Sequence, residues 1–264
     1  MEGFSILIIL MGLLFGSFLN VLIYRLPLNI SLFSPKRSTC RECNHTITWY
    51  ENIPLLSYIF LKAQCSSCKN KISLTYPIVE ILTSIITYIL YLKVGLNQEF
   101  YYLILISYLL IVLSFIDLKF KAVPSSLLVI ITTITLTYLL TNKLENFSIF
   151  FMFAGGIVIV DLFVTYYIQN IKANILKNDI LKTQKAIGEG DIPIIAIIGG
   201  LLGLKFGIIA IFISAILAII PAVLNIILKK EIETPFIPFL SLGFIITYTN
   251  ENTIQKILEG LNIV

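Results

Sequence analysis

Long apolar runs fill most of this chain, and short polar stretches separate them. A helix needs about 20 consecutive apolar residues to cross a bilayer, so such runs predict membrane spans. The pattern therefore predicts an all-α polytopic membrane protein with about eight transmembrane helices. The eight runs are residues 4–24, 77–94, 101–116, 124–141, 147–168, 192–204, 206–228 and 235–249.

Two of these runs are irregular. The sixth is thirteen residues long, short of the about 20 that a span requires, and Gly199-Gly200 and Gly203 are its expected breaks. We expect it to begin in the headgroup region or to lie between other helices. The eighth carries Pro235 and Pro238, which preclude a regular helix across both. It either lines a cavity, where irregular backbone is tolerated, or simply starts a helix at the interface.

The composition supports a membrane protein. Hydrophobic residues make up 58% of the 264 residues, above the about 45–50% of soluble domains. The net charge of +4 does not indicate a nucleic-acid partner, because lysine and arginine are concentrated in particular loops. Threading eight spans places fifteen of the nineteen basic residues on one side, which the positive-inside rule makes cytoplasmic. Both termini are then external, and without a signal-peptide pattern the first run stays as a span.

The largest polar stretch is an insert between the first two spans. Residues 25–76 hold all four cysteines and are expected to form a small cytoplasmic domain. Residues 1–24 would then be the first transmembrane helix, and residues 77–264 the membrane core that carries the acidic residues discussed below.

The cysteines of the insert form two Cys-x-x-Cys pairs, each followed by a similar step that ends in Ile47 or Ile72. Such a repeat is typical of zinc ribbons, and disulfides, the alternative, rarely persist in the cytoplasm. His45 is an alternative ligand, although a surface position suits it better. A closed four-thiolate site has no open position for water, so we expect structural zinc. The four expected ligands are Cys40, Cys43, Cys65 and Cys68.

Two aspartates stand at the ends of apolar runs. Asp117 ends the third run, and Asp191 closes Gly188-Glu189-Gly190-Asp191 before the sixth. Carboxylates at an apolar boundary are functional candidates because ionisation there is costly. The eight-span topology places both aspartates at the cytoplasmic face of the membrane. Two carboxylates that share one proton can act as base and acid, which is aspartic protease chemistry. Gly188 and Gly190 permit a close backbone approach, while helix capping is the simpler role for Asp191.

Other residues leave alternatives open. Glu80 and Asp161 are expected to be structural, Glu80 beside an interfacial cation and Asp161 as a hydrogen-bond partner, with a third site position as the alternative for Asp161. The single histidine lies in the insert, so no Ser-His or Cys-His centre is available elsewhere. A proton-coupled carrier that uses Asp117, Asp161 and Asp191 is one rival function, and a non-catalytic assembly protein of a secretion system is another.

Taken in order, these motifs resemble the type IV prepilin peptidases, membrane aspartyl enzymes with a Gly-x-Gly-Asp motif. Each piece alone is weak, but their shared order is specific and runs through most of the chain. The matching segments are residues 16–21, 24–27, 49–58, 76–80, 115–117, 188–191 and 235–240, together with the cysteine pairs.

The resemblance implies a bifunctional enzyme of the bacterial cytoplasmic membrane. Asp117 and Asp191 would remove the basic leader of type IV prepilins and type II secretion pseudopilins at the cytoplasmic face. The new N-terminal amine would then be methylated with S-adenosylmethionine, an activity associated in the family with the cysteine insert. The sequence has no Rossmann-type glycine loop that marks a site for this cofactor, and it does not define the oligomeric state.

The sequence departs from the family pattern at two positions. Pro193 stands where a lysine usually follows the second aspartate, and Ser125 stands where an aspartate usually follows the proline equivalent to Pro124. Both changes leave the two acids intact, so they bear on substrate preference rather than on the reaction type.

Overall fold

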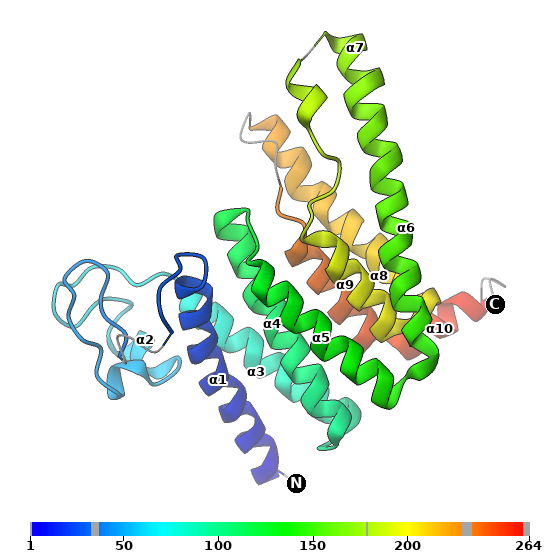
Figure 1. Cartoon of the computed structure of the whole chain (residues 1–264). Coiled ribbons are helices and arrows are strands. Elements are labelled where there is room, and N and C mark those ends of the chain that lie inside the picture. Colours follow the sequence, from blue (N-terminus) through cyan, green and yellow to red (C-terminus); the bar gives the residue numbers. More distant parts are fainter. Residues whose placement is uncertain (1, 33–36, 178, 229–233, 261–264) are drawn as a thin grey trace. The chain divides into compact units, whose positions relative to one another are not determined.

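The computed structural model describes residues 2–32, 37–177, 179–228 and 234–260 (Figure 1). The chain divides into an N-terminal unit, Met1–Pro124, and a C-terminal unit, Ser125–Val264. In the part of the chain described, the regular elements are all helices, and the β-structure consists of two isolated bridges. The all-helical prediction is confirmed.

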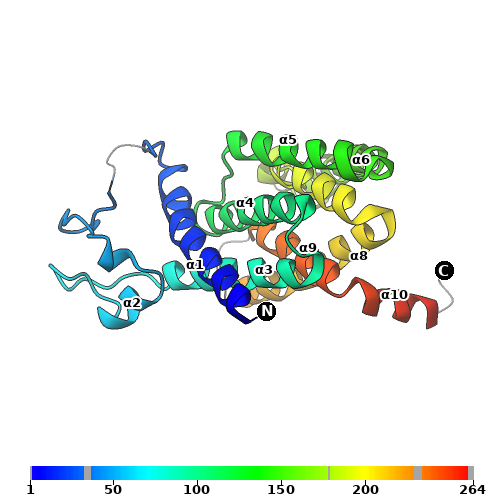
Figure 2. The ribbon, with the colours of Figure 1, turned by 90° about the horizontal axis from the view of Figure 1, so that it is seen from below.

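The N-terminal unit contains three long helices and the insert. The first helix packs mainly against the second long helix, and the third contacts both (Figure 2). The short helix α2 lies within the insert. The helices are α1 (Glu2–Arg25), α2 (Leu56–Phe60), α3 (Thr75–Val94) and α4 (Gln98–Phe120).

Small residues bring α1 and α3 into close contact. A Cβ atom on Gly12 would lie 2.5 Å from the Cα of Ser84, and one on Gly16 would lie 2.6 Å from the Cα of Glu80. Glycines four residues apart are a common device for close helix pairing in membranes. One turn later, the side-chain amide of Asn20 donates to the backbone carbonyl of Tyr76 at 3.1 Å. The segment 16–20 therefore fixes how α1 sits on the start of α3.

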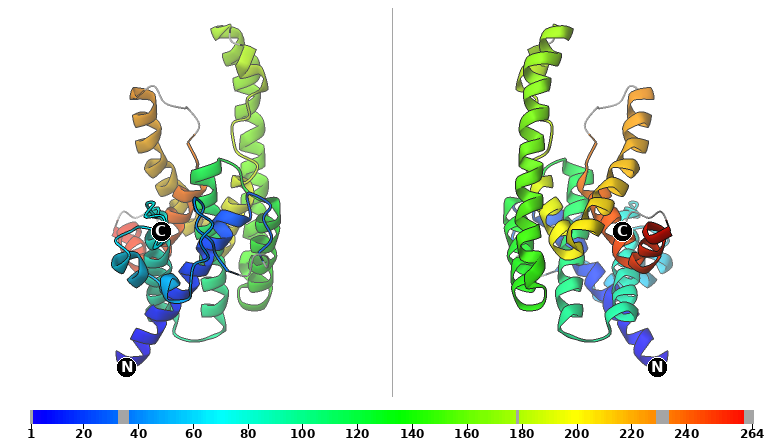
Figure 3. Two further views of the ribbon diagram at one scale, coloured as in Figure 1. Left: turned by 90° about the vertical axis from the view of Figure 1, so that its left-hand side faces the viewer. Right: turned by 90° about the vertical axis from the view of Figure 1, so that its right-hand side faces the viewer.

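The C-terminal unit contains the remaining helices. The helix α6 continues through a π-helical segment, η3, into α7, and this arm extends beyond α5 and α9 (Figure 3). The amphipathic α10 follows α9 and has no buried side chain. The helices are α5 (Ser125–Asn142), α6 (Phe147–Tyr166), η3 (Tyr167–Lys172), α7 (Ala173–Leu176), α8 (Asp191–Ile227), α9 (Ile237–Thr249) and α10 (Glu251–Gly260).

The helix α8 is two helices joined at a sharp bend. Gly203 has a φ of 78°, which lies outside the helical region, and separates residues 191–202 from residues 204–227. A Cβ atom on Gly207 would lie 3.0 Å from the Cα of Gly199, so the two limbs fold back on each other, as Figure 1 also shows. The sixth and seventh apolar runs are therefore separate helices, as predicted.

The break expected at Gly199-Gly200 is wrong, because the helix continues through both residues. A Cβ atom on Gly199 would lie 2.3 Å from the ring of Phe153, and one on Gly200 would lie 2.8 Å from a methyl of Leu139. These glycines allow the first limb of α8 to approach α6 and α5. They serve packing, while Gly203 alone makes the bend.

The eighth run begins as a helix after its first proline. The helix α9 starts at Ile237, and Pro238 occupies its first turn, where a missing N–H leaves no hydrogen bond unmade. By length and composition, six helices can cross a membrane, and α9 is a shorter apolar helix. With the limbs of α8 taken separately, the described residues contain eight apolar helices, as the sequence predicts.

Candidate metal centre and acidic residues

The cysteine insert is built from two equivalent turns. In the first, the N–H of Cys40 donates to the carbonyl of His45 at 2.9 Å. In the second, the N–H of Cys65 donates to the carbonyl of Asn70, also at 2.9 Å. Each turn also closes through one isolated antiparallel bridge. The repeat read from the sequence is therefore a repeat of structure.

Each turn needs a residue in the left-handed region. Asn44 and Lys69, which follow the second cysteine of each pair, have φ values of 55° and 60°. Asparagine adopts this conformation at little cost, whereas lysine does so less readily. The matching backbone at both positions brings each Cys-x-x-Cys pair into one cluster.

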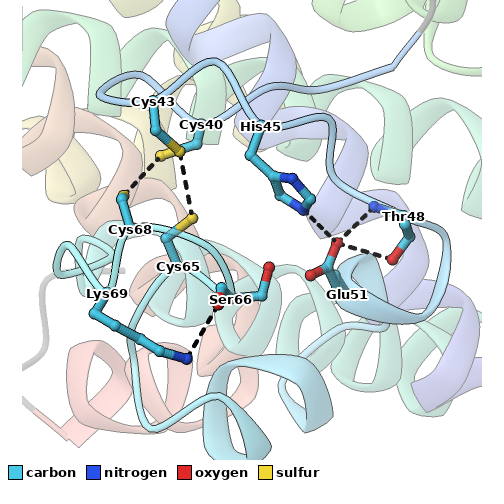
Figure 4. Close-up of polar contacts among 9 residues, drawn as sticks. All are labelled: Cys40, Cys43, His45, Thr48, Glu51, Cys65, Ser66, Cys68 and Lys69. Carbon is cyan, nitrogen blue, oxygen red and sulfur yellow. Dashed lines mark hydrogen bonds and ion pairs between the residues drawn. The ribbon is translucent and has the colours of Figure 1, made fainter.

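The four sulfur atoms lie within 4.8 Å of one another (Figure 4). The Sγ atoms of Cys40 and Cys68 are 3.8 Å apart, and those of Cys43 and Cys65 are 3.9 Å apart. Tetrahedral zinc with Zn–S bonds of about 2.3 Å requires sulfurs about 3.8 Å apart. The cluster therefore fits a four-thiolate zinc site, as predicted.

The thiols differ in acidity. Backbone N–H groups of Cys43 and Glu42 lower the pKa of Cys40 to about 6, which favours its thiolate. Although the N–H of Asn70 favours the Cys68 thiolate, desolvation and the neighbouring sulfurs outweigh it and raise the pKa of Cys68 to about 12. A cation bound among the sulfurs would remove this conflict, because metal coordination deprotonates thiols.

His45 does not join the sulfur cluster. Its Nε2 atom lies 3.6 Å from the carboxylate of Glu51, and Figure 4 shows the ring directed toward that residue. The alternative of His45 as a metal ligand is not supported by this geometry.

Glu51, which the sequence analysis did not single out, joins the two turns. Its carboxylate accepts from the N–H and the hydroxyl of Thr48 at 2.7 and 2.8 Å. Hydrogen bonds from Ser66 and then Thr48 lower the pKa of Glu51 from 4.5 to about 2. Since the folded form has the lower pKa, this stabilisation is complete above about pH 4.5 and is lost as the pH falls toward about 2. At neutral pH the contacts of Glu51 are fully present.

We expect Glu51→Gln to loosen the metal site at pH 7, because the amide cannot accept every hydrogen bond that the carboxylate accepts. The folded insert should lose about 2 kcal/mol, typical of hydrogen bonds to a charged group. Transfer of zinc to a chromogenic chelator should therefore become faster. The matched control is Glu42→Gln, since Glu42 is exposed between Cys40 and Cys43. Equal release from both variants would contradict this role for Glu51.

Glu80 ties the insert to α3. Its buried carboxylate accepts from the N–H of Leu55 at 2.9 Å and hydrogen-bonds the side chain of Ser17. Leu55 has a φ of 59°, a strained conformation for leucine, which this hydrogen bond helps to hold. The structural role expected for Glu80 is confirmed, but its partner is a backbone N–H in place of the expected cation.

Asp161 fixes the loop that leads to Asp191. Its carboxylate accepts from the N–H of Ile187 at 3.0 Å and from the hydroxyl of Thr165 at 3.1 Å. The Thr165 oxygen in turn accepts from the N–H of Ala186 at 3.1 Å. Asp161 is therefore a hydrogen-bond partner, as expected, and it anchors the residues immediately before Gly188.

The Gly-x-Gly-Asp motif packs tightly around Asp191. The N–H of Asp191 donates to the carbonyl of Gly188 at 3.0 Å, and a Cβ atom on Gly188 would lie 3.0 Å from the Asp191 carboxylate. Gly188 thus lets the backbone approach the acid closely. The carboxylate of Glu189 is paired with Lys185, which lowers the pKa of Glu189. Glu189 therefore does not share the role expected for Asp191.

The two expected acids end and begin helices. Asp117 is buried in the last turn of α4, and Asp191 is the first residue of α8. Asp117 belongs to the N-terminal unit and Asp191 to the C-terminal unit, so their pairing stays a prediction. Pro193 lies in the first turn of α8, where its missing N–H is harmless, and Ser125 begins α5.

The apolar helices and the four-thiolate insert define a multi-pass membrane protein with a metal-binding insert. Residues 10–94 match the family described as Bacterial Peptidase A24 N-terminal domain, and residues 104–223 match the Type IV leader peptidase family. The chain belongs to the prepilin leader peptidase/N-methyltransferase family.

Relatives with the name Prepilin leader peptidase/N-methyltransferase come from several bacteria. The Vibrio cholerae protein is 32% identical over 82% of this chain and 85% of its own length. The Bacillus subtilis protein is 29% identical over 92% of both chains. The Myxococcus xanthus protein is 42% identical, but the match spans 48% of this chain and 37% of that relative. No solved structure matches the chain.

Proposed function

We propose that Asp117 and Asp191 form the peptidase centre of a membrane enzyme that cleaves prepilin leaders and methylates the new N-terminus. Family membership supports the overall activity, because the relatives carry it in their name. The observation that carries the site is the packing around Asp191, where Gly188 and the loop held by Asp161 surround a carboxylate at the start of α8. This arrangement positions an acid at a helix end.

The chemistry requires one ionised and one protonated aspartate. The ionised carboxylate removes a proton from a water molecule, and the resulting hydroxide attacks the peptide carbonyl. The protonated carboxyl polarises that carbonyl and later gives its proton to the leaving amine. The peptide C–N bond breaks, and no covalent acyl-enzyme forms. Two neighbouring carboxylates share a proton in this way because both cannot ionise together.

The substrate is a prepilin or pseudopilin lying in the membrane. Its basic leader remains in the cytoplasm while its apolar helix enters between the spans, which brings the scissile bond to the membrane surface. The helix ends that carry Asp117 and Asp191 face the cytoplasm in the topology drawn from the lysine and arginine distribution. The same topology places the insert in the cytoplasm and both termini outside.

The zinc in this proposal is structural. The four cysteines would occupy all positions of a tetrahedral ion, which leaves none for a reactive water. The ion would hold the two turns of the insert together. Glu80 then connects the insert to α3 through the N–H of Leu55.

Methylation needs a neutral amine. S-adenosylmethionine supplies an electrophilic methyl group when it is bound. An α-amino group with a pKa of about 7.7–8.0 loses its proton at modest cost near neutral pH, so a strong base is not required. The protein has to place the amine and exclude competing water.

We expect Asp161→Ala to lower kcat for prepilin cleavage about tenfold and to change KM less, because misplaced catalytic groups weaken the transition state. Asp161→Asn should retain most of the rate, since its amide oxygen can still accept from Ile187 and Thr165. An Asn variant as slow as the Ala variant would mean that the charge of Asp161 is required, which favours the alternative in which Asp161 is a third member of the site. The measurement is initial cleavage rate in detergent.

One assay tests the proposed function as a whole. The purified protein is mixed with a prepilin and S-adenosylmethionine, and the mass of the product's N-terminal peptide is measured. Cleavage with one added methyl supports both activities. An uncut prepilin would reject the peptidase proposal, and a cut but unmethylated product would reject the methylation.

A further inference from the structure

The short helix α2 of the insert has an exposed apolar face. Its exposed side chains are Leu56, Ile59 and Phe60, which recur at helical spacing and therefore lie on one side of the helix. Ile59 is 68% exposed and Phe60 is 80% exposed. Apolar side chains that gather on one face of an otherwise polar insert indicate a surface that another phase or molecule covers.

The opposite face of α2 is bound to the second metal-binding turn. The hydroxyl of Tyr58 donates to the carbonyl of Ile72 at 3.3 Å. The N–H of Ala63 donates to the carbonyl of Tyr58 at 2.8 Å, and the N–H of Ile72 donates to the carbonyl of Ala63, also at 2.8 Å. These bonds hold α2 with its apolar face directed away from the metal-binding turn.

The contacts of Glu80 fix the depth of α2 relative to the membrane spans. The N–H of Leu55, the residue before α2, donates to the Glu80 carboxylate at 2.9 Å, and that carboxylate also hydrogen-bonds Ser17 of α1. Ser17 lies about two turns, or about 12 Å, before the end of α1 at Arg25. The start of α2 is therefore level with the apolar part of a helix that can cross a membrane. In Figure 1, α2 is accordingly level with α1 and does not extend beyond its end.

The backbone around α2 is suited to surroundings of low polarity. Lipid offers no hydrogen bonds, so backbone groups at membrane depth have to be paired within the protein. The N–H and the hydroxyl of Ser57 both donate to the carbonyl of Ile53, at 3.1 and 2.8 Å. The N–H of Ile59 donates to the carbonyl of Leu55 at 3.1 Å, and the N–H of Leu55 is paired as described above. Pro54 has no N–H to pair.

We propose that α2 is embedded in the membrane interface, with Leu56, Ile59 and Phe60 in contact with lipid. A helix in the interface buries its apolar face about 5–10 Å into the boundary between headgroups and acyl chains, a depth comparable to that set by Ser17. The neighbouring span presents the same kind of surface at that level, since Phe18 of α1 is also exposed. Because α2 is bound to the second metal-binding turn, embedding it holds the whole insert against the membrane surface.

The test uses a single tryptophan as a probe of α2. Trp49 is the only tryptophan in the chain, so Trp49→Phe combined with Phe60→Trp leaves one probe on the apolar face. The matched control combines Trp49→Phe with Glu42→Trp, which places the probe at an exposed charged position of the first metal-binding turn. Both full-length variants are reconstituted in phosphatidylcholine vesicles, and zinc content verifies that the insert is folded. Emission is measured with acyl chains brominated near the headgroup and, separately, with acrylamide in the water.

We expect the Phe60→Trp probe to lose about half of its emission or more to the brominated lipid, because bromine quenches on contact and an interfacial helix lies about 5–10 Å deep. Its emission should also be shifted to the blue. Acrylamide should quench it less than it quenches the control probe, and the brominated lipid should affect the control probe little. This pattern assigns the apolar face of α2 to lipid.

Three other results would each overturn the inference. A Phe60→Trp probe that acrylamide quenches and brominated lipid does not would place α2 in water. A blue-shifted probe that neither agent quenches would show that protein covers the face, either the rest of this chain or a second copy of it. A probe that acrylamide quenches until a prepilin is added would make the face a docking surface for the substrate. All three leave the proposed peptidase and methylation activities standing, since the probe reports only the surroundings of α2.

Discussion

Asp117→Asn and Asp191→Asn should each reduce prepilin cleavage by at least about 10³-fold, because an amide can neither take a proton from water nor return one to the leaving amine. The shape of each side chain is almost unchanged. We therefore expect both variants to fold, to keep their zinc and to bind prepilin. The measurement is the initial rate of leader removal by purified protein in detergent.

The matched control is Asp179→Asn, which removes the charge of an exposed aspartate in the loop before the Gly-x-Gly-Asp motif. Asp179 pairs with Lys182 at 2.7 Å on the surface, so its loss should not affect cleavage. If Asp117→Asn or Asp191→Asn cleaves at near the parent rate, that residue is not part of the centre. If the control also fails, the effect of the other variants is general.

The second large effect is expected in the insert. Replacing Cys40 and Cys68 together by serine removes two of four thiolates from the cluster, and their Sγ atoms are 3.8 Å apart. A tetrahedral site with half of its ligands should lose the metal almost completely, and the insert should then unfold locally, since binding and folding of such sites are coupled. Zinc per protein by elemental analysis should fall from about one to near zero.

His45→Gln provides the control for that result. Its ring lies against Glu51, so the variant should keep zinc at the parent level. Loss of zinc from His45→Gln would make the histidine a ligand after all. Retention of zinc by the double cysteine variant would refute the four-thiolate assignment.

The membrane helices could be predicted from the sequence because hydrophobic length is a direct physical requirement for spanning. The position of the bend in α8 could not be predicted from the sequence. Gly199, Gly200 and Gly203 look alike in sequence, yet the first two face Phe153 and Leu139, and only Gly203 adopts a positive φ. Which glycine bends a helix depends on its neighbours in space, and a hydropathy pattern does not contain that information.

The metal cluster could be predicted because its ligands follow a short local pattern. A Cys-x-x-Cys pair places two sulfurs on one turn, and its repetition supplies the other two. Glu51 and Asp161 are different, because they act through backbone groups. The N–H of Ile187 that Asp161 holds lies 26 residues away in the chain, and neither partner is distinctive in sequence.

The cation–π contact of Arg41 also depends on residues that are distant in sequence. Arg41 looks like an ordinary cation of a basic insert until the fold places it over Tyr24, a residue of α1. The sequence does show that Arg41 lies between the two cysteines of a metal-binding turn. Counting the basic residues of each loop predicts the topology, but it does not show which residue an individual cation contacts.

The cooperation of Asp117 and Asp191 is tested most directly by the cleavage rate of the double variant Asp117→Asn/Asp191→Asn against the two single variants. If one carboxyl activates water and the other protonates the leaving group, each is useless alone, and the double variant should be no slower than the slower single one. A double variant whose rate falls by the product of the two single losses would show independent residues, and would contradict a shared catalytic centre.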